Sequence, residues 1–244
     1  MFLNPLPNNG NMISVVLPTY NERENILKLI EHIENVVKRN KLKSEIVVVD
    51  DSSPDGTAAA VKALNKNYGN IRVLIRKKKL GVGSAHMFGY QHSNGDVIIA
   101  MDTDLSHDPE QIIAMIEKMN EGYDIVAGSR HMKGSYYERK TPETRRKYIA
   151  SKYGNMLTTF LSGVPIHDFT NGFRAIRKYV VKNVETESTG NSFLMEFLVK
   201  AHKKGYRVTE IPVTFKDRKF GHSKLQLEKE SLKYIRDLLK YLWT

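Results

Sequence analysis

The sequence predicts an α/β fold with a mostly parallel central sheet and helices on both faces. Short apolar runs rich in β-branched residues alternate along the chain with segments of helical periodicity. The runs are too short for helices, and their continuous apolar character is typical of strands buried on both faces. Because the 244 residues contain no internal repeat or clear linker, we expect one domain over residues 12–244, preceded by a disordered leader, residues 1–11.

The predicted elements follow one another in this order. The strands cover residues 13–17, 45–49, 71–75, 97–101, 124–127 and 207–213. The first helix begins after Asn21, where Glu24 completes a capping box, and its apolar residues recur at helical spacing. A second, alanine-rich helix follows residues 55–57, and a third follows Asp108 and Pro109, which suit its cap and first turn. Further on we expect helices near 145–161, 191–204 and 226–242, a mobile polar loop over 131–147 and a basic loop over 216–224.

The charge of the chain is unevenly divided. There are 38 Lys and Arg residues against 27 Asp and Glu, a formal net charge of +11, and no cysteine. The lack of cysteine excludes disulfides, zinc–thiolate sites and thiol catalysis. Residues 1–128 hold 14 basic and 16 acidic residues, a net charge of −2, whereas residues 129–244 hold 24 and 11, a net charge of +13. This division indicates a site at which carboxylates do one task and cations another.

Acidic residues follow three of the predicted strands. They lie within residues 18–22, 50–56 and 102–104. In open α/β sheets, ligands bind at the carboxyl ends of the strands. Asp102 and Asp104 are two residues apart in an extended segment, so they point the same way and suit Mg²⁺ or Mn²⁺ completed by substrate phosphates. The alternative is that they cap the next helix, a role that Asp108 fills better.

The second acidic segment also has two interpretations. Turn residues at 52–56 explain a turn there, but they do not require the two acids, Asp50 and Asp51, that precede it. A carboxylate at this place suits the N–H groups of a nucleobase. Gly81 and Gly83 lack the third glycine of a dinucleotide fingerprint, and no P-loop occurs. The sequence therefore argues against dinucleotide dehydrogenases and P-loop NTPases, and we expect a helix to start at 81–85.

Three segments resemble the family-2 inverting glycosyltransferases of GT-A fold. They are residues 15–22 (VVLPTYNE), 48–57 (VVDDSSPDGT) and 101–107 (MDTDLSH). Later segments are similar to a narrower group within that family, the dolichol-phosphate mannose synthases. These are residues 127–130, 168–174, 215–218 and 221–224. The resemblance runs from about residue 13 to the end of the chain, and it implies a donor nucleotide and metal half, 12–128, and an acceptor half, 129–244.

The resemblance implies transfer of mannose from GDP-mannose to the phosphate of dolichol or another polyprenol, with inversion at the anomeric carbon. The implied donor-binding residues are Pro18, Tyr20, Glu22, Asp50, Asp51, Asp102, Thr103, Arg218 and Lys224. Asp102 and Asp104 would hold Mg²⁺ or Mn²⁺, with Ser106 at a position where some members have glutamine. Arg218 and Lys224 would close over the donor diphosphate.

The acceptor side is assigned in the same way. Arg130 and Ser151 would contact the acceptor phosphate. A second acceptor arginine is expected four residues before Ser151, where this sequence has Lys147 with Arg146 beside it, so both remain candidates. Catalysis is expected to depend on Asp104, Arg130 and Arg218.

The chemistry of this reaction agrees with these residue types. The acceptor phosphate is already an anion, so no strong general base is needed; a metal and Arg or Lys side chains help two anions to approach and a diphosphate to leave. Outside this set, Asp168 and Arg174 either pair across a turn or belong to the site. Glu196 lies in an apolar helical stretch, and buried glutamate needs a partner, which the sequence does not name.

Two other functions stay open. One is another family-2 transferase, such as one that moves glucose from UDP-glucose to polyprenyl phosphate. The other is a basic nucleic-acid-binding protein, for which the sequence offers no recognition helix, aromatic RNA-binding pattern or zinc spacing. That second alternative also leaves the acids at the strand ends unexplained, so we expect no nucleic-acid partner.

The final helix bears on membrane contact. Its apolar face carries Leu232, Ile235, Leu239 and Leu242 among basic residues. This face either rests on an anionic membrane surface or packs against the sheet, the commoner arrangement in globular domains. No apolar run reaches the ~20 residues that span a bilayer. The resemblance implies a peripheral enzyme at the cytoplasmic face of the endoplasmic reticulum or, in a prokaryote, of the plasma membrane; some members carry a transmembrane tail and others use small membrane-anchoring subunits.

Overall fold

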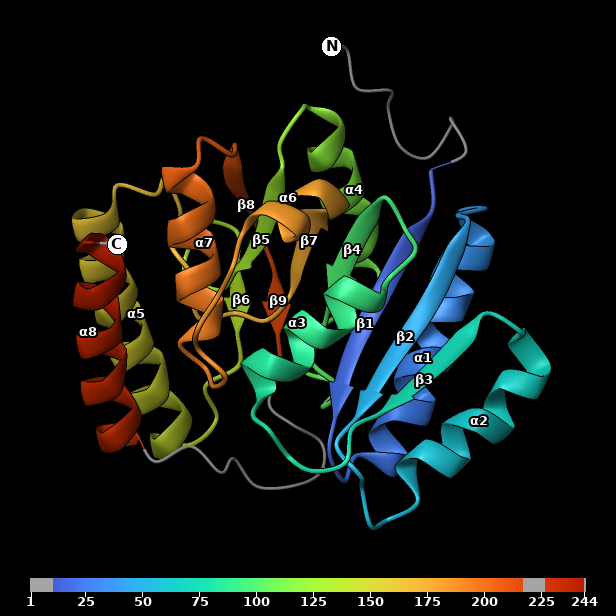
Figure 1. The fold of residues 1–244 in the computed structure, drawn as a ribbon. Helices are drawn as coiled ribbons and strands as arrows, with labels where there is room; N and C mark the ends of the chain where they lie inside the picture. Colours follow the sequence, from blue (N-terminus) through green and yellow to red (C-terminus); the bar gives the residue numbers. More distant parts are fainter. Residues whose placement is uncertain (1–10, 217–226, 244) are drawn as a thin grey trace.

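A seven-stranded sheet forms the centre of the molecule (Figure 1). The computed structural model describes residues 11–216 and 227–243. The strand order is β3-β2-β1-β4-β7-β5-β8. The strands are β1 (Ile13–Thr19), β2 (Ser44–Asp50), β3 (Ile71–Ile75), β4 (Val97–Ala100), β5 (Ile125–Ser129), β7 (Arg174–Arg177) and β8 (Val208–Pro212). Within this sheet only β7 runs antiparallel to its neighbours, so the predicted mostly parallel sheet is confirmed. A second sheet pairs β6 (Tyr136–Tyr137) with β9 (Thr214–Phe215).

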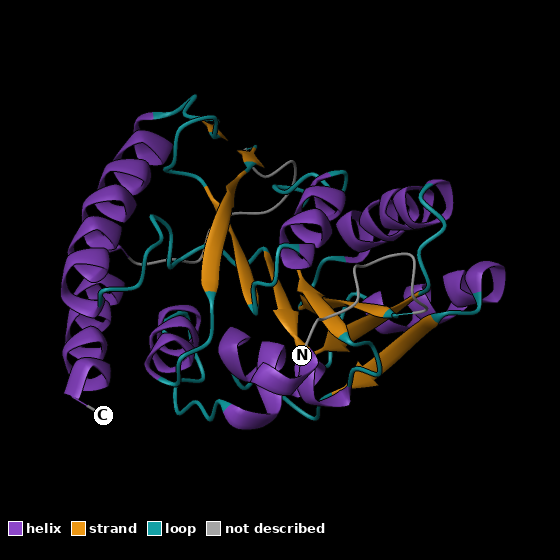
Figure 2. Ribbon diagram, turned by 90° about the horizontal axis from the view of Figure 1, so that it is seen from above, coloured by secondary structure: helices purple, strands orange, loops and turns teal. Residues whose placement is uncertain are grey.

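Helices cover both faces of the sheet, as Figure 2 shows. They are α1 (Arg23–Arg39), α2 (Thr57–Tyr68), α3 (Val82–His92), α4 (Gln111–Asn120), α5 (Pro142–Ser162), α6 (Lys178–Asn183), α7 (Phe193–Lys203) and α8 (Leu227–Trp243). Residues of α1, α2 and α4 pack with Val15 and Leu17 on one face, and residues of α3, α6 and α7 pack with Val16 on the other. Beyond α7, α8 and α5 stand side by side at the edge of the molecule (Figure 1).

The first helix is not capped as predicted. It begins at Arg23, and no side-chain capping bond forms at its N-terminus. Instead, the carboxylate of Asp55, from the loop after β2, accepts the N–H of Arg23 at 3.2 Å. Asn21 adopts a left-handed backbone with φ of 59° and donates its N–H to the Ser53 hydroxyl. A neighbouring loop therefore supplies the cap, which a local capping box cannot anticipate.

The polar loop is shorter than predicted. Residues 142–147 are helical, because Thr141 and Thr144 form a capping box and Pro142 occupies the first turn of α5. The segment between β5 and α5 is therefore limited to residues 130–141 and includes the short strand β6.

The strand β7 and the helix α6 are missing from the sequence-based prediction. Arg174 and Arg177 make this segment resemble an exposed one, yet both side chains are buried. Arg174 donates to the carbonyls of Phe169 and two other residues, and Arg177 donates to the carbonyl of Met119 at 3.0 Å. Because both guanidinium groups donate to backbone carbonyls, a charged segment can lie inside the sheet.

Candidate active site

The carboxyl ends of β2, β1 and β4 meet at one edge of the sheet, because these strands are neighbours. The three acidic segments predicted to form the site are therefore brought together. The N–H of Asp51 donates to the carbonyl of Thr19 at 3.2 Å, and the hydroxyl of Thr103 donates to the carbonyl of Pro18 at 3.4 Å. These bonds tie the end of β1 to the segments after β2 and β4.

Asp50 and Asp51 are both buried and both engaged. The carboxylate of Asp50 accepts the N–H and the hydroxyl of Ser53. The two oxygens of Asp51 accept Nε and Nη2 of Arg76 at 2.5 and 2.7 Å. Arg76 also donates to the hydroxyl of Ser84 at the start of α3. A nucleobase would therefore meet an Asp51–Arg76 pair and not a lone carboxylate.

Sequence reasoning missed Arg76. It follows β3, and β3 is the neighbour of β2 in the sheet, so its side chain emerges beside Asp51. Its position at the end of a strand, next to the strand that precedes Asp51, is the signal that would have identified it. The three lysines that follow, 77–79, made the whole segment resemble a solvated basic run.

The remaining donor-side residues lie on the loop between β1 and α1. The ring of Tyr20 lies under the ammonium group of Lys79, 4.6 Å from the ring centre. The carboxylate of Glu22 accepts the side-chain amide of Asn25 at 2.7 Å. The loop therefore presents an aromatic ring and an oriented acid at the edge where the strand ends meet.

The predicted metal ligands Asp102, Asp104 and Ser106 lie just after β4. Asp104 is buried, and its Oδ1 accepts the N–H of Ser106 at 3.0 Å. The side chain of Asp102 is 39% exposed, and its Oδ2 lies 3.4 Å from Nε2 of the buried His107. The Ser106 hydroxyl is buried without a hydrogen-bond partner. Two carboxylates and an unsatisfied hydroxyl are the hard oxygen donors that Mg²⁺ and Mn²⁺ prefer, so the residues fit such a metal.

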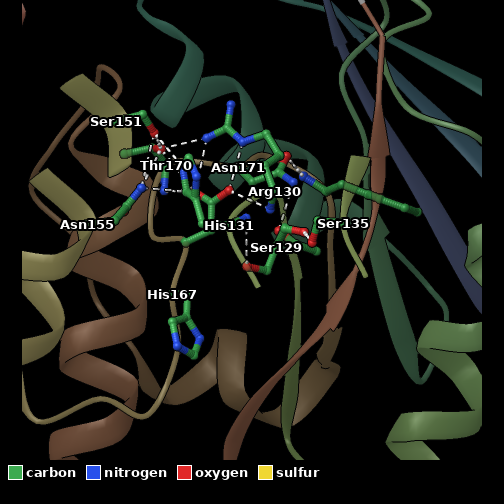
Figure 3. A network of polar contacts seen from close by, with 12 residues as sticks. Ser129, Arg130, His131, Ser135, Ser151, Asn155, His167, Thr170 and Asn171 are labelled. Carbon is green, nitrogen blue, oxygen red and sulfur yellow. Dashed lines mark hydrogen bonds and ion pairs between the residues drawn. The ribbon is translucent and has the colours of Figure 1, made fainter. Parts of the chain in front are cut away.

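On the acceptor side, Arg130 at the end of β5 forms a bidentate ion pair with Asp168 (Figure 3). Its Nε and Nη2 lie 2.7 and 3.0 Å from the two carboxylate oxygens, and Nη2 also donates to the Thr170 hydroxyl at 2.7 Å. The Arg130 guanidinium further lies over the rings of Tyr137 and Phe215, at 5.9 and 5.2 Å. Asp168 is fully buried. Of the two alternatives left open for Asp168 and Arg174, the pair across a turn is wrong, since Arg130 pairs with Asp168.

Ser151 lies on α5, directly beside this ion pair. Its hydroxyl contacts Nε2 of His131 at 3.0 Å and the Thr170 hydroxyl at 3.2 Å, and it accepts the side-chain amide of Asn155 at 3.1 Å. Figure 3 shows these side chains converging from α5 and from the loops after β5 and before β7. The structure thus brings Arg130 and Ser151 together, as predicted.

Arg130 and Asp168 are the charged groups among the side chains around Ser151. Burial alone would raise the pKa of Asp168, but the Arg130 guanidinium more than reverses this, so the pKa lies well below its usual range. Burial, with the nearby Arg130 charge, lowers the pKa of His131 to about 4. His131 is therefore neutral at pH 7, and Arg130 and Asp168 carry the charges of the cluster.

Arg146 and Lys147 lie in the first turns of α5. Arg146 is exposed, whereas Lys147 is partly buried and pairs with Glu143 at 2.5 Å. Lys147 is four residues from Ser151, which places both on one face of the helix, and Arg146 is turned about 100° away.

The predicted residues Arg218 and Lys224 lie outside the described residues. The described chain just before them is bonded to the segment after β4 that holds the predicted metal ligands. His107 forms a β-bridge with Phe215, and the N–H of Lys216 donates to the carbonyl of Ser106 at 2.9 Å.

Glu196, for which the sequence named no partner, is fully buried on α7. Its carboxylate accepts the N–H groups of Glu187 and Ser188 and pairs with Lys200 one turn later at 2.8 Å. It therefore fixes the loop before α7 and has no part in the site.

Of the apolar face expected on α8, Leu242 packs against the core, but Ile235 and Leu239 do not. Ile235 and Leu239 are 45% and 49% exposed, whereas Leu238 and Tyr241 are buried. The inward face of α8 is therefore turned by about one residue from the face that the sequence suggested. No helix in residues 11–216 and 227–243 has the length and apolar character needed to cross a membrane.

Comparison with known proteins identifies relatives that match most of the chain. Residues 14–185 match the family model described as glycosyl transferase family 2. A dolichol-phosphate mannosyltransferase of Pyrococcus furiosus is 40% identical over 234 residues, which cover 94% of this chain and 64% of that protein. A polyprenol monophosphomannose synthase of Mycolicibacterium smegmatis is 34% identical over 218 residues, which cover 86% of this chain and 80% of that protein. This chain thus spans slightly less than two thirds of the Pyrococcus relative.

Among solved structures, glucosyl-3-phosphoglycerate synthase from Mycobacterium tuberculosis has a similar fold. Its complex with phosphoglyceric acid matches with a TM-score of 0.71 and 20% identity, covering 96% of this chain and 80% of that chain. A complex of that enzyme with Mg²⁺ and UDP also gives 0.71, and one with Mn²⁺, UDP and phosphoglyceric acid gives 0.69. At this identity the likeness establishes the fold alone.

Proposed function

This chain belongs to glycosyl transferase family 2, and on that basis we propose that it transfers mannose from GDP-mannose to the phosphate of dolichol or another polyprenol, inverting the anomeric carbon. The names of the two relatives support the acceptor and the sugar. The observation that carries the proposal is the division of the site: carboxylates gather at the ends of β1, β2 and β4, and Arg130, Lys147 and Ser151 lie on the opposite side.

The acidic edge would hold the donor. Asp102 and Asp104, with Ser106 beside them, would hold Mg²⁺ or Mn²⁺, and the metal would neutralise charge on the leaving diphosphate. The metal-bound structures of the M. tuberculosis enzyme, which shares this fold, support a divalent ion in general. Tyr20, Glu22 and the Asp51–Arg76 pair would contact the nucleoside, and the basic residues Arg218 and Lys224 would cover the diphosphate.

The basic side would hold the acceptor phosphate. Nε and Nη2 of Arg130 are taken by Asp168 and Thr170, which fixes the plane of the guanidinium and leaves Nη1 to meet a phosphate oxygen. Between the two candidates for the second cation we favour Lys147, because it shares a helix face with Ser151.

The reaction then needs positioning and charge stabilisation more than acid–base catalysis. An oxygen of the acceptor phosphate attacks the anomeric carbon from the side opposite GDP. The bond from that carbon to the β-phosphate oxygen breaks, and its electron pair leaves with GDP. Arg130 and Lys147 offset the charge of the nucleophile while it approaches another anion.

Isothermal titration calorimetry tests the donor assignment. We expect GDP-mannose to bind in the presence of Mg²⁺ or Mn²⁺ and to lose most of its affinity in EDTA, because the two carboxylates repel a diphosphate without a metal. UDP-glucose serves as the matched ligand. Tight UDP-glucose binding without a GDP-mannose signal would favour a glucosyl transferase, and salt-sensitive DNA binding without either nucleotide would favour the nucleic-acid alternative.

We further propose that the membrane surface that carries the acceptor lies against an apolar stripe on α5. The stripe is formed by residues at helical spacing on the outward side of that helix: Ile149, Tyr153, Met156, Leu157 and Phe160. All are exposed, and Phe160 is 84% exposed. The opposite face of α5 is polar and buried, with Asn155 and Thr158 turned inward. This arrangement is the reverse of an ordinary surface helix, so the apolar side has no covering within the described chain.

Charge and position favour a lipid bilayer as the occupant. Exposed cations occur on α5 and on the adjacent α8: Arg145, Arg146, Lys152, Lys233, Arg236 and Lys240. Ile235 and Leu239 of α8 extend the apolar area. The stripe and the proposed acceptor-phosphate residues Lys147 and Ser151 lie on the same helix, so an α5 that rests on the membrane carries part of the acceptor site with it. We propose that the enzyme works as a peripheral protein at the cytoplasmic face of the membrane.

Vesicle flotation tests this surface. Met156→Asp combined with Phe160→Asp should lower the fraction bound to vesicles of anionic phospholipid at least ~10-fold, because burial of one large apolar side chain contributes about 1.5–3 kcal/mol. Tyr68→Asp, an exposed aromatic residue on α2, is the matched control and should bind like the wild type. Equal flotation of the α5 variant and the wild type would contradict the assignment.

A further inference from the structure

We propose that His107 is a positioning residue that holds the carboxylate of Asp102 in the orientation required by the divalent metal. This inference rests on the proposed function, in which Asp102 is a metal ligand. It concerns a residue beside the metal, and three observations on the ring of His107, its neighbours and Asp102 support it.

The first observation is the unsatisfied imidazole. The side chain of His107 is fully buried, and neither Nδ1 nor Nε2 makes a hydrogen bond. A buried polar group without a partner costs about 1–3 kcal/mol, so this arrangement calls for a reason. Nε2 lies 3.4 Å from Oδ2 of Asp102, a few tenths of an ångström beyond a normal hydrogen bond. A small movement of the carboxylate therefore completes the bond.

The second observation is that the ring itself cannot turn away. The rings of Phe173 and Phe215 both pack against it, each with its centre 5.2 Å from that of the imidazole. The backbone of His107 bridges to Phe215, and the neighbouring carbonyl of Ser106 accepts the N–H of Lys216. Nε2 is therefore held in place by β9 and by two aromatic side chains.

The third observation concerns the other side of Asp102. Gly172 backs the carboxylate so closely that a Cβ at this position would lie 2.8 Å from Oδ1. The carboxylate of Asp102 thus lies between the Gly172 backbone and the imidazole of His107. A glycine is therefore required at position 172 for space, since its backbone does not adopt the left-handed conformation that favours glycine.

Together these contacts give each predicted metal carboxylate its own support. The N–H of Ser106 donates to Asp104 at 3.0 Å, and Nε2 of His107 lies 3.4 Å from Asp102, ready to donate to it. Donors of this kind orient metal ligands and reduce the freedom that a ligand loses when the metal binds, and their removal typically weakens metal affinity by 10–100-fold. His107 therefore contributes to metal affinity without touching the metal.

Titration of Mn²⁺ in the presence of GDP, followed by the electron paramagnetic resonance signal of free Mn²⁺, tests this role. His107→Phe keeps the ring and removes the nitrogen, and we expect its Kd for Mn²⁺ to rise about 10–100-fold. His107→Gln places an amide N–H near the position of Nε2 and should bind Mn²⁺ within about threefold of the wild type. His92→Phe makes the same chemical change on α3, where the imidazole contacts Phe88, and as the control it should leave the Kd unchanged.

A second variant makes the test independent of the histidine. Gly172→Ala adds a single Cβ that displaces Oδ1 of Asp102, and it should weaken Mn²⁺ binding to a similar extent while the thermal midpoint stays that of a folded protein. Unchanged Mn²⁺ affinity in His107→Phe would overturn the role of His107, whatever Gly172→Ala does, and would leave the proposed function intact. Failure of the wild type to bind Mn²⁺ with GDP would overturn the metal assignment itself, which is a different outcome.

Discussion

Asp104→Asn should lower the rate of mannose transfer by roughly 10³-fold or more while the protein stays folded. Asparagine keeps a side-chain oxygen that accepts the N–H of Ser106, so the loop after β4 retains its hydrogen bond. It removes the negative charge that would hold the metal against the donor diphosphate. Loss of a metal that stabilises the leaving group removes several kcal/mol of transition-state stabilisation, and each 1.36 kcal/mol is a factor of ten.

The measurement is the rate of transfer from GDP-mannose to a polyprenyl phosphate, with circular dichroism and thermal melting to check the fold. Asp108→Asn is the matched control, because it makes the same chemical change four residues later. The prediction that Asp108 caps α4 is wrong: its carboxylate accepts the N–H of Glu110 in the turn before that helix. An asparagine oxygen can accept the same hydrogen bond. Its rate should stay within about twofold of the wild type. Retention of near-normal activity by Asp104→Asn would remove Asp104 from the mechanism.

Arg130→Met should have the largest effect on stability and should also abolish transfer. The variant leaves the fully buried Asp168 without its cation, and breaking a buried ion pair in this way costs about 3–5 kcal/mol. Urea unfolding measures this loss. Lys140→Met is the control, because it breaks an ion pair with Glu138 in which the Lys140 side chain is 74% exposed. It should change the free energy of unfolding by less than about 1 kcal/mol.

A double variant separates stability from function. Arg130→Met with Asp168→Asn removes both charges, and the amide still accepts the N–H of Thr170. We expect most of the lost stability to return while transfer stays absent, because the acceptor phosphate has still lost its arginine. Recovery of transfer in the double variant would show that Arg130 acts only through the fold.

The pH dependence of the single variant has a definite sign. In the wild type the folded-state pKa of Asp168 is depressed, so the stabilisation is present above the unfolded pKa near 4 and is lost as the pH falls. Without Arg130, burial dominates and raises that pKa, so the variant loses stability as the pH rises above 4. The difference in unfolding free energy between wild type and variant should therefore be largest at pH 7 and shrink towards pH 4.

The donor edge was predictable because it follows from topology. Continuous apolar runs identify the buried strands, and the acids at their ends are brought together by any parallel sheet that makes those strands neighbours. Pairings across the fold could not be obtained in this way. Asp168 has an arginine six residues away, yet it pairs with Arg130, 38 residues earlier, because Arg174 turns toward backbone carbonyls inside the sheet.

The helices at the edge of the molecule illustrate a second limit. The spacing of apolar residues on α5 and α8 is the spacing of an ordinary buried face, and the sequence cannot say which side of a helix meets the protein. The polar side of α5 turns inward because Asn155 and Thr158 find partners there: Asn155 accepts the N–H of Phe169, and the Thr158 hydroxyl meets that of Tyr234.

The reversed direction of β7 decides which parts of the chain tolerate rearrangement. Every parallel strand delivers its following segment to the ligand edge, but β7 begins there, so its preceding segment, which holds Asp168, Thr170 and Gly172, reaches the site. The far end of β7 passes into α6 at Lys178, on the opposite edge. New chain termini in the segment before β7 would consequently separate Arg130 from its carboxylate and Asp102 from its backing glycine.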